Sequence, residues 1–225
     1  MPCFQVAVRE TDLWVCAGAY LEKETRDLVI EARHQIETYI RSHPEFVESL
    51  QPLPEDPWAP SIVRKMLVET AKVHVGPMAS VAGAIAQYVG ERLLKLTGEV
   101  IVENGGDIFL KADRPLTVSI FAGASPLSGK LGLRIPLGQM PLGVCSSSGT
   151  VGHSLSHGIA DAVCAVSPSA VLADAAATAL GNRIKKKKDL EMTAEWAGRI
   201  DGLLGGLLVL RDSLATWGDI ELVAT

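Results

Sequence analysis

Residues 167–182 of the chain read Ser-Pro-Ser-Ala-Val-Leu-Ala-Asp-Ala-Ala-Ala-Thr-Ala-Leu-Gly-Asn. Ser167 is a residue type that caps helix N-termini, and Pro168 suits the first helical position, where its missing N–H has no helical partner anyway. Gly181 and Asn182 tolerate the left-handed conformation in which many helices end. The stretch therefore predicts an alanine-rich helix whose backbone can approach a neighbouring element closely.

Two polar side chains stand out on this helix. Asp174 and Thr178 are four residues apart, so their oxygen atoms lie one turn apart on the same face. A carboxylate and a hydroxyl on an apolar helix need a partner when they are buried, and a hard cation such as Mg²⁺ binds oxygen ligands of this kind. The alternative is local: Thr178 bonds back to the carbonyl of Asp174, and Asp174 pairs with an Arg or Lys elsewhere.

The composition is that of a folded domain. The chain has 225 residues, of which 48% are hydrophobic and 21% are charged, so it can bury a sizeable core. Its net charge of −5 argues against a nucleic-acid partner, which requires a basic surface. We find no apolar run long enough to span a bilayer and no secretory signal pattern at residues 1–5. We therefore expect a cytoplasmic protein without a membrane or nucleic-acid partner.

The four cysteines show no metal-binding or redox spacing. Cys3, Cys16, Cys145 and Cys164 contain no CxxC pair, and reduced thiols are the expectation for a cytoplasmic protein. Cys16 and Cys164 lie in apolar, strand-like runs, which predicts that they are small core residues.

Hydrophobic periodicity predicts an α+β fold. Strands and helices come in runs with no repeat or linker, which indicates one domain spanning residues 1–225, or two intertwined subdomains. The pattern predicts a hairpin of strands 4–8 and 13–19, helices at 23–41, 61–73, 77–97 and 190–200, strands at 99–102, 108–111, 116–122, 130–137 and 162–166, and a closing hairpin of strands 203–210 and 220–223.

Two polar stretches are candidates for ligand binding. The run Asn104-Gly105-Gly106-Asp107 fits a plain hairpin turn, and it also fits a turn whose N–H groups face an anion. Residues 145–161 are rich in hydroxyl groups and glycine, which is typical of a ligand loop. Within that loop His153, His157 and Asp161 are spaced four apart, which on a helix would imitate a zinc triad.

Several of these stretches together resemble a known family. The segments that carry the resemblance are Gly83-Ala-Ile-Ala-Gln87, Asn104-Gly-Gly-Asp-Ile108, Ser147-Ser-Gly149 with His153, and Ala173-Asp-Ala-Ala-Ala-Thr-Ala-Leu180. They are similar to the ApbE superfamily, the FAD:protein FMN transferases, and occur in the same order over residues 75–182. The whole chain resembles a shorter ApbE-like branch of that superfamily.

The resemblance implies a fold and a site. The fold would be ApbE-like and T-fold-related, with mixed or antiparallel sheets packed against long helices and a ligand cleft between them. Mg²⁺ would be held by the side chains of Asp174 and Thr178 and by the backbone carbonyl of Ala84, and it would bind the pyrophosphate of FAD or a similar nucleotide. His153 and Asp174 would be catalytic. The nucleotide would be lined by Asn104, Gly105, Gly106, Asp107, Ser148, Gly149 and Thr150.

The resemblance also implies an activity. In the transferases a hydroxyl of an acceptor protein attacks the flavin-side phosphorus of FAD, and AMP leaves. Val81 and Gln87 stand where the family usually has an aspartate and a lysine, so the alternative is a flavin- or nucleotide-binding protein without transferase chemistry. A zinc hydrolase built on His153, His157 and Asp161 is the third hypothesis. A homodimer is a further partner that the sequence leaves open.

Overall fold

The structure, a computed structural model, describes residues 1–149 and 158–225. Its largest element is an antiparallel sheet of eight strands in the order β1-β2-β3-β4-β7-β8-β9-β10. These strands are β1 (Cys3–Val8), β2 (Thr11–Ala17), β3 (Val100–Asn104), β4 (Asp107–Lys111), β7 (Leu142–Ser147), β8 (Ala162–Ser167), β9 (Gly205–Leu210) and β10 (Ser213–Gly218).

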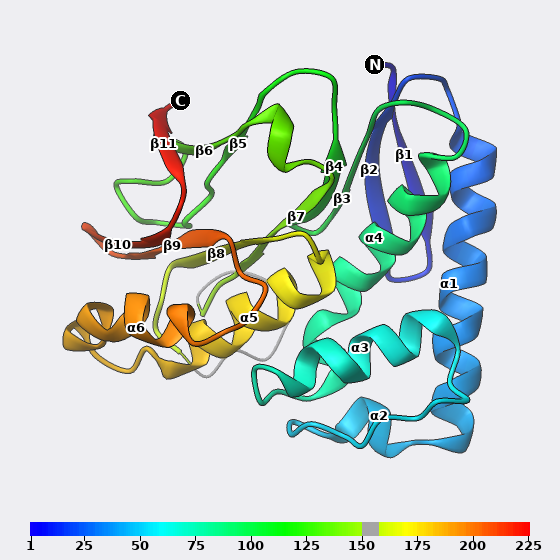
Figure 1. Ribbon diagram of the computed structural model, residues 1–225, viewed down its shortest axis with the longest axis horizontal. Coiled ribbons are helices and arrows are strands. Elements are labelled where there is room, and N and C mark those ends of the chain that lie inside the picture. Colours follow the sequence, from blue (N-terminus) through cyan, green and yellow to red (C-terminus); the bar gives the residue numbers. More distant parts are fainter. Residues whose placement is uncertain (150–157) are drawn as a thin grey trace.

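Helices cover one face of this sheet, and a small second sheet packs on the other (Figure 1). The small sheet has the order β11-β6-β5. Its strands are β5 (Leu116–Ser119), β6 (Leu131–Ile135) and β11 (Glu221–Ala224), and the α-helices are α1 (Glu22–Ser42), α2 (Glu45–Glu48), α3 (Ser61–Ala71), α4 (Val81–Leu93), α5 (Ala170–Arg183) and α6 (Thr193–Gly198). The 3₁₀ helices are η1 (Pro77–Ser80), η2 (Leu137–Gln139) and η3 (Lys187–Met192).

The central strands are apolar on both faces because each face has its own core. Phe109 points into the core beneath the helices, whereas the next residue, Leu110, points into the core beneath the small sheet. On β9, Leu208 points into the core beneath the helices and Leu207 points into the core beneath the small sheet. This is the period-2 alternation of a strand with both sides buried. The expected α+β class, with antiparallel sheets packed against long helices, is confirmed.

Helix α5 begins and ends later than the sequence predicts. Ser169, not Ser167, is the N-cap, and its side chain accepts a hydrogen bond from the Leu172 N–H. Ser167 is instead the last residue of β8. At the other end the helix runs through Gly181 to Arg183, because Gly181 adopts no left-handed conformation here.

Two predictions, the polar loop from residue 145 and the closing hairpin, were wrong. Residues 142–147 form β7, a central strand between β4 and β8, although the sequence pattern placed residues from 145 onward in a polar loop. The hairpin partner of β9 is β10, not the segment 220–223. That last segment lies in β11 and pairs with β6 in the other sheet. In each case pairing across the fold overrides a weak local pattern.

The expectation of reduced thiols is wrong for two of the four cysteines. Cys3 and Cys16 face each other across the β1–β2 hairpin and form a disulfide. Cys16 is therefore not a core thiol, and it is partly exposed. Cys145 and Cys164 are free and buried, which was expected of Cys164 but not of Cys145, the first residue of the predicted polar loop. Within the described ranges we find no helix that is both long and apolar enough to cross a membrane.

Candidate functional site

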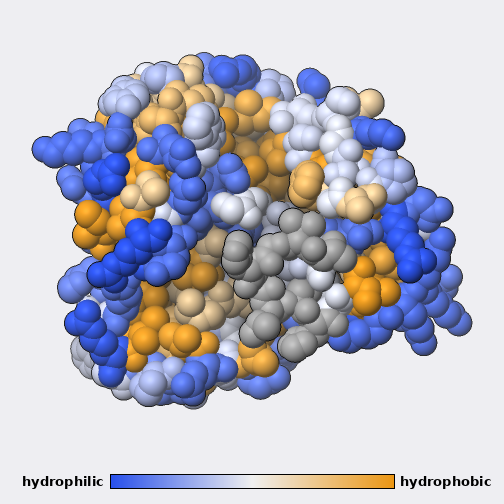
Figure 2. Space-filling model, turned by 180° about the vertical axis from the view of Figure 1, so that it is seen from behind, coloured by the Kyte–Doolittle hydropathy of each residue, from blue (hydrophilic) through white to orange (hydrophobic). Residues whose placement is uncertain are grey.

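The large sheet and the helices leave a cleft of about 1950 Å³. One wall is the exposed side of β2 and β3, with Trp14 and Ile101, and another is the small sheet near Phe121. The cleft continues past the β3–β4 turn to α5, where Asp174 and Thr178 line it. Figure 2 shows apolar surface exposed in hollows between hydrophilic rims on one face of the molecule. The cleft is therefore mostly apolar, with polar groups gathered at one end, as in many ligand sites.

Asp174 is held in place by the N-terminus of α4. Its Oδ2 accepts a hydrogen bond of 2.9 Å from the Gly83 N–H. The close approach requires glycine, because a Cβ on Gly83 would lie 2.4 Å from the carbonyl oxygen of Ala170 on α5. The small residues of α4 thus let the start of α4 approach the carboxylate of Asp174 on α5. Small side chains in α4 predict tight packing of this kind.

Asp107 is a second buried carboxylate beside Asp174. It begins β4, directly after the Gly105-Gly106 turn, and is 6% exposed, while Asp174 is 7% exposed. Its Oδ1 accepts a 3.1 Å hydrogen bond from the Ser146 N–H on β7. Sheet pairing and the α4–α5 contact therefore bring two acidic residues, 67 positions apart in the sequence, into one site.

Burial raises the pKa of both carboxyl groups. The pKa of Asp174 rises to about 7 because burial disfavours its charge, and hydrogen bonds from the Gly83 and Ala82 N–H groups oppose the rise. The pKa of Asp107 lies well above its ordinary value, first because of burial and then because of the nearby charge of Asp174. In the described residues neither carboxylate forms an ion pair with Lys, Arg or His. The expected alternative, in which Asp174 pairs with a basic residue, is not found there.

This set of donors fits a hard divalent cation. Two carboxylates and the Thr178 hydroxyl are oxygen donors, and the negative charge of the site lacks a protein counterion among the described residues. Ala84, the expected carbonyl ligand, is buried in α4 and is not part of the cleft lining; Ala82 is. No group of three or more His, Cys, Asp or Glu side chains suited to a metal occurs in ranges 1–149 and 158–225. Any cation held here would thus need hydroxyl, carbonyl or ligand oxygens as well.

The turn between β3 and β4 is a two-residue hairpin. Gly105 and Gly106 have φ of +63° and +103°, values that glycine adopts without strain. The Gly106 N–H donates to the Glu103 Oε1 at 3.0 Å, and the Asn104 amide donates to the Ala82 carbonyl at 3.1 Å. The turn therefore links the sheet to α4, and one of its N–H groups already has an anionic partner within the chain.

The remaining predicted residues lie in or beside the stretch after β7. Ser148 lines the cleft. Gly149 does not, and its N–H donates to the Ala160 carbonyl at 2.9 Å. Thr150, His153 and His157 lie outside the described residues. Asp161, the third member of the zinc hypothesis, accepts a hydrogen bond from the Arg211 N–H.

Two residues of the site were not predicted from the sequence, and the role of Gln87 beside it was also not foreseen. His74 and Arg183 line the far end of the cleft, and neither residue belongs to a motif that the sequence analysis singled out. Gln87, which the resemblance places at a position of lysine, is 5% exposed and lies outside the cleft lining. Its Oε1 accepts from the Val171 N–H in the first turn of α5 at 3.4 Å, so it joins α4 to α5.

Solved structures with this architecture include flavin transferases. The structure superimposes on the apo form of the flavinyl transferase ApbE from Pseudomonas stutzeri with a TM-score of 0.60 and 17% identity, covering 100% of this chain and 94% of that chain. It superimposes on the ApbE protein from Thermotoga maritima with a TM-score of 0.58 and 14% identity, covering 98% and 96%. The fold is therefore that of the ApbE flavin transferases.

The family itself follows from sequence comparison. The family model described as AbpE bacteria matches residues 2–212, and the chain belongs to this family. A UPF0280 protein from Methanocella arvoryzae is 41% identical over 212 residues, which cover 94% of this chain and 86% of the relative. A UPF0280 protein from Methanocaldococcus jannaschii is 39% identical over 229 residues, covering 98% and 93%. The resemblance expected from the motifs is confirmed.

Proposed function

We propose that the chain is a Mg²⁺-dependent, ApbE-like enzyme that acts on the pyrophosphate of FAD or of a related nucleotide. The observation that carries the proposal is the buried pair Asp107 and Asp174, which lines a large cleft beside Thr178 without a basic counterion among the described residues. A cation at this point would neutralise the pair and bind phosphate oxygens of a ligand in the cleft. The ApbE fold supports a flavin nucleotide as that ligand.

The side chains of Asp174 and Thr178 would hold the ion, with a backbone carbonyl near the start of α4, for which Ala84 is the sequence-based candidate. Bound Mg²⁺ would polarise the phosphoryl group and stabilise the charge of the leaving phosphate. The Gly83 N–H donates to Oδ2 of Asp174, so bound Mg²⁺ would share this carboxylate with the backbone N–H groups of Gly83 and Ala82. Asp107 and Asn104 would position the nucleotide from the sheet side.

In the proposed transfer an acceptor hydroxyl forms a bond to the flavin-side phosphorus, and the bond from that phosphorus to the bridging oxygen breaks. The electron pair stays on the phosphate of AMP, and the hydroxyl proton goes to a base. His153 is our candidate for that base, because imidazole accepts protons near neutral pH. The apolar wall with Trp14 and Ile101 would hold the flavin ring.

The test measures FAD binding by calorimetry and, in the presence of an acceptor peptide with a threonine hydroxyl, AMP release by chromatography, each with and without Mg²⁺. We expect Mg²⁺-dependent binding, with both binding and AMP release reduced roughly a hundredfold in Asp174→Asn. The exposed Asp201→Asn is the matched control and should behave as the wild type. Mg²⁺-dependent binding that Asp174→Asn leaves unchanged would contradict the proposed site.

A second candidate function is a flavin- or nucleotide-binding protein without transfer chemistry. Gln87 favours it, because its amide bonds to the α5 backbone where the superfamily usually has a charged lysine. In the same experiment this candidate gives Mg²⁺-dependent FAD binding without AMP. Release of AMP from FAD would exclude it.

A further inference from the structure

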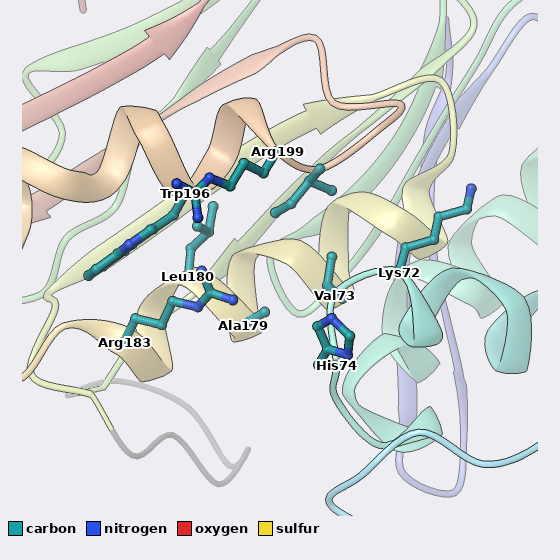
Figure 3. Close-up of a pocket in the computed structure, with 9 residues that line it drawn as sticks. Lys72, Val73, His74, Ala179, Leu180, Arg183, Trp196 and Arg199 are labelled. Carbon is teal, nitrogen blue, oxygen red and sulfur yellow. The ribbon is translucent and has the colours of Figure 1, made fainter.

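A smaller cavity of about 240 Å³ adjoins the far end of the cleft. Four basic side chains line it, namely Lys72, His74, Arg183 and Arg199 (Figure 3). The apolar part of its lining includes Leu180 and Trp196. His74 and Arg183 line both this cavity and the cleft, so the two spaces are neighbours.

The positive charge around this cavity is not fully neutralised. Lys72 pairs with Glu69 at 2.7 Å, and Arg199 pairs with Glu195. Arg183 forms no ion pair with any residue in ranges 1–149 and 158–225. Its guanidinium carbon lies 5.6 Å from the centroid of the Trp196 ring. Among the described residues that line the cavity, none is acidic.

The fold holds these groups at a defined place. His74 has φ of +60°, which is uncommon outside glycine, and lies between the buried residues Val73 and Val75. Arg183 is the last residue of α5, nine positions after Asp174. At 1.5 Å per residue, the two backbone positions are roughly 13 Å apart along the helix. The basic cavity is therefore separate from the carboxylate pair.

We propose that this cavity binds a phosphate monoester. A doubly charged phosphate matches the unpaired Arg183 guanidinium, with His74, Lys72 and Arg199 as further donors, and guanidinium groups bind phosphate through two parallel hydrogen bonds. The volume suits a phosphate with a small attached group. The apolar surface of Leu180 and Trp196 would contact that group. The phosphate belongs either to the ligand of the cleft or to a separate molecule.

The first arm of the test uses inorganic phosphate in EDTA at constant ionic strength, so that it does not depend on a metal. Binding is followed by the indole NMR resonance of Trp196, assigned with Trp196→Phe. We expect the resonance to shift with added phosphate until it saturates. The Kd for phosphate should rise at least about tenfold in Arg183→Gln, because this variant loses one pair of charge-assisted hydrogen bonds. Lys130→Gln removes one exposed charge outside the lining of both cavities and should change Kd less than about twofold.

No saturable shift, or equal weakening by Arg183→Gln and Lys130→Gln, overturns the proposal. Thermal melting confirms that each variant is folded. Asp174→Asn should leave phosphate binding in EDTA unchanged, so failure of the proposed metal site and failure of this cavity give different results.

The second arm compares NADP⁺ with NAD⁺ in Mg²⁺, since the two differ by one phosphate monoester. Tighter binding of NADP⁺ that Arg183→Gln abolishes would assign the phosphate to the cleft ligand. Equal binding of both, together with a positive first arm, would assign it to a separate phosphate-bearing molecule.

Discussion

Among single residues, Asp174 and Asp107 carry most of the chemistry of the site. A buried carboxylate usually has a basic partner or a bound cation, because its charge is costly away from water. Here the Gly83 N–H donates to one oxygen of Asp174, and the Ser146 N–H donates to one oxygen of Asp107. These bonds orient the carboxylates but do not neutralise them, which is why the pKa of both groups is raised.

The raised pKa predicts how stability depends on pH in metal-free protein. The pKa of Asp174 is about 7 in the folded state and 3.8 ordinarily. Below the lower value both states are protonated. Between about pH 4 and pH 7 the unfolded state loses its proton first, so the free energy of unfolding should fall as pH rises. Urea denaturation in EDTA at pH 5 and pH 8 measures this fall.

Asp174→Asn should reduce that fall, because the asparagine carries no charge at either pH. Mg²⁺ added at pH 8 should stabilise the wild type but not this variant. The same pH dependence in both proteins would show that Asp174 is not the group responsible. Asp201→Asn, which changes an exposed carboxylate, serves as the control.

At the scale of elements, the contact between α4 and α5 assembles the site. Gly83 lets the two helices approach, and Gln87 one turn later accepts a hydrogen bond from the α5 backbone. The position of Asp174 relative to α4 depends on this contact. A change that separates the helices should therefore affect both stability and the site.

Gly83→Ala tests this contact. The added Cβ would lie 2.4 Å from the Ala170 oxygen and 2.9 Å from the Asp174 Cβ, so the helices must shift. We expect a loss of about 1–3 kcal/mol in the free energy of unfolding. Gly198→Ala in α6 is the matched control, since a Cβ there meets nothing within 4 Å and alanine favours the helix. Equal effects of the two changes in chemical denaturation would contradict the packing argument.

For the whole molecule, the eight-stranded sheet separates two cores and so fixes the walls of the cleft. The small sheet packs on β4, β7, β8 and β9 but leaves Trp14 on β2 about half exposed, at 49%. Its edge strand β5 then forms the opposite wall. The cleft therefore exists because the second sheet covers only part of the first.

Leu133→Ala tests whether the second core holds the small sheet in place. Leu133 is fully buried on β6, at 0% exposure, so its truncation should cost about 2–5 kcal/mol of unfolding free energy. Leu137 is 50% exposed, and Leu137→Ala should cost less than about 1 kcal/mol. Thermal and urea denaturation measure the stability of the two variants. A similar loss of unfolding free energy in both would show that this core contributes little to stability.

Much of the fold was accessible from local patterns. The period of apolar residues located α1 and the β1–β2 hairpin within a few residues, because one face of each is buried. The central strand β7 was missed because Cys145, Ser146 and Ser147 have the composition of a loop. The long helix expected at 77–97 is a 3₁₀ turn followed by α4, and the one at 190–200 is η3 followed by α6.

The sequence by itself determined the family, the α+β class, and Asp174 and Thr178 as residues of interest, since helical spacing and motif order are local properties. Only the tertiary structure decided that Asp107 lies beside Asp174, that Cys3 bonds to Cys16, and that Arg183 and His74 share a cavity. The two aspartates, and likewise Arg183 and His74, are brought together by packing between distant segments, whereas the two cysteines are brought together by the register of the β1–β2 hairpin. Such contacts depend on how the layers assemble, which no local pattern encodes.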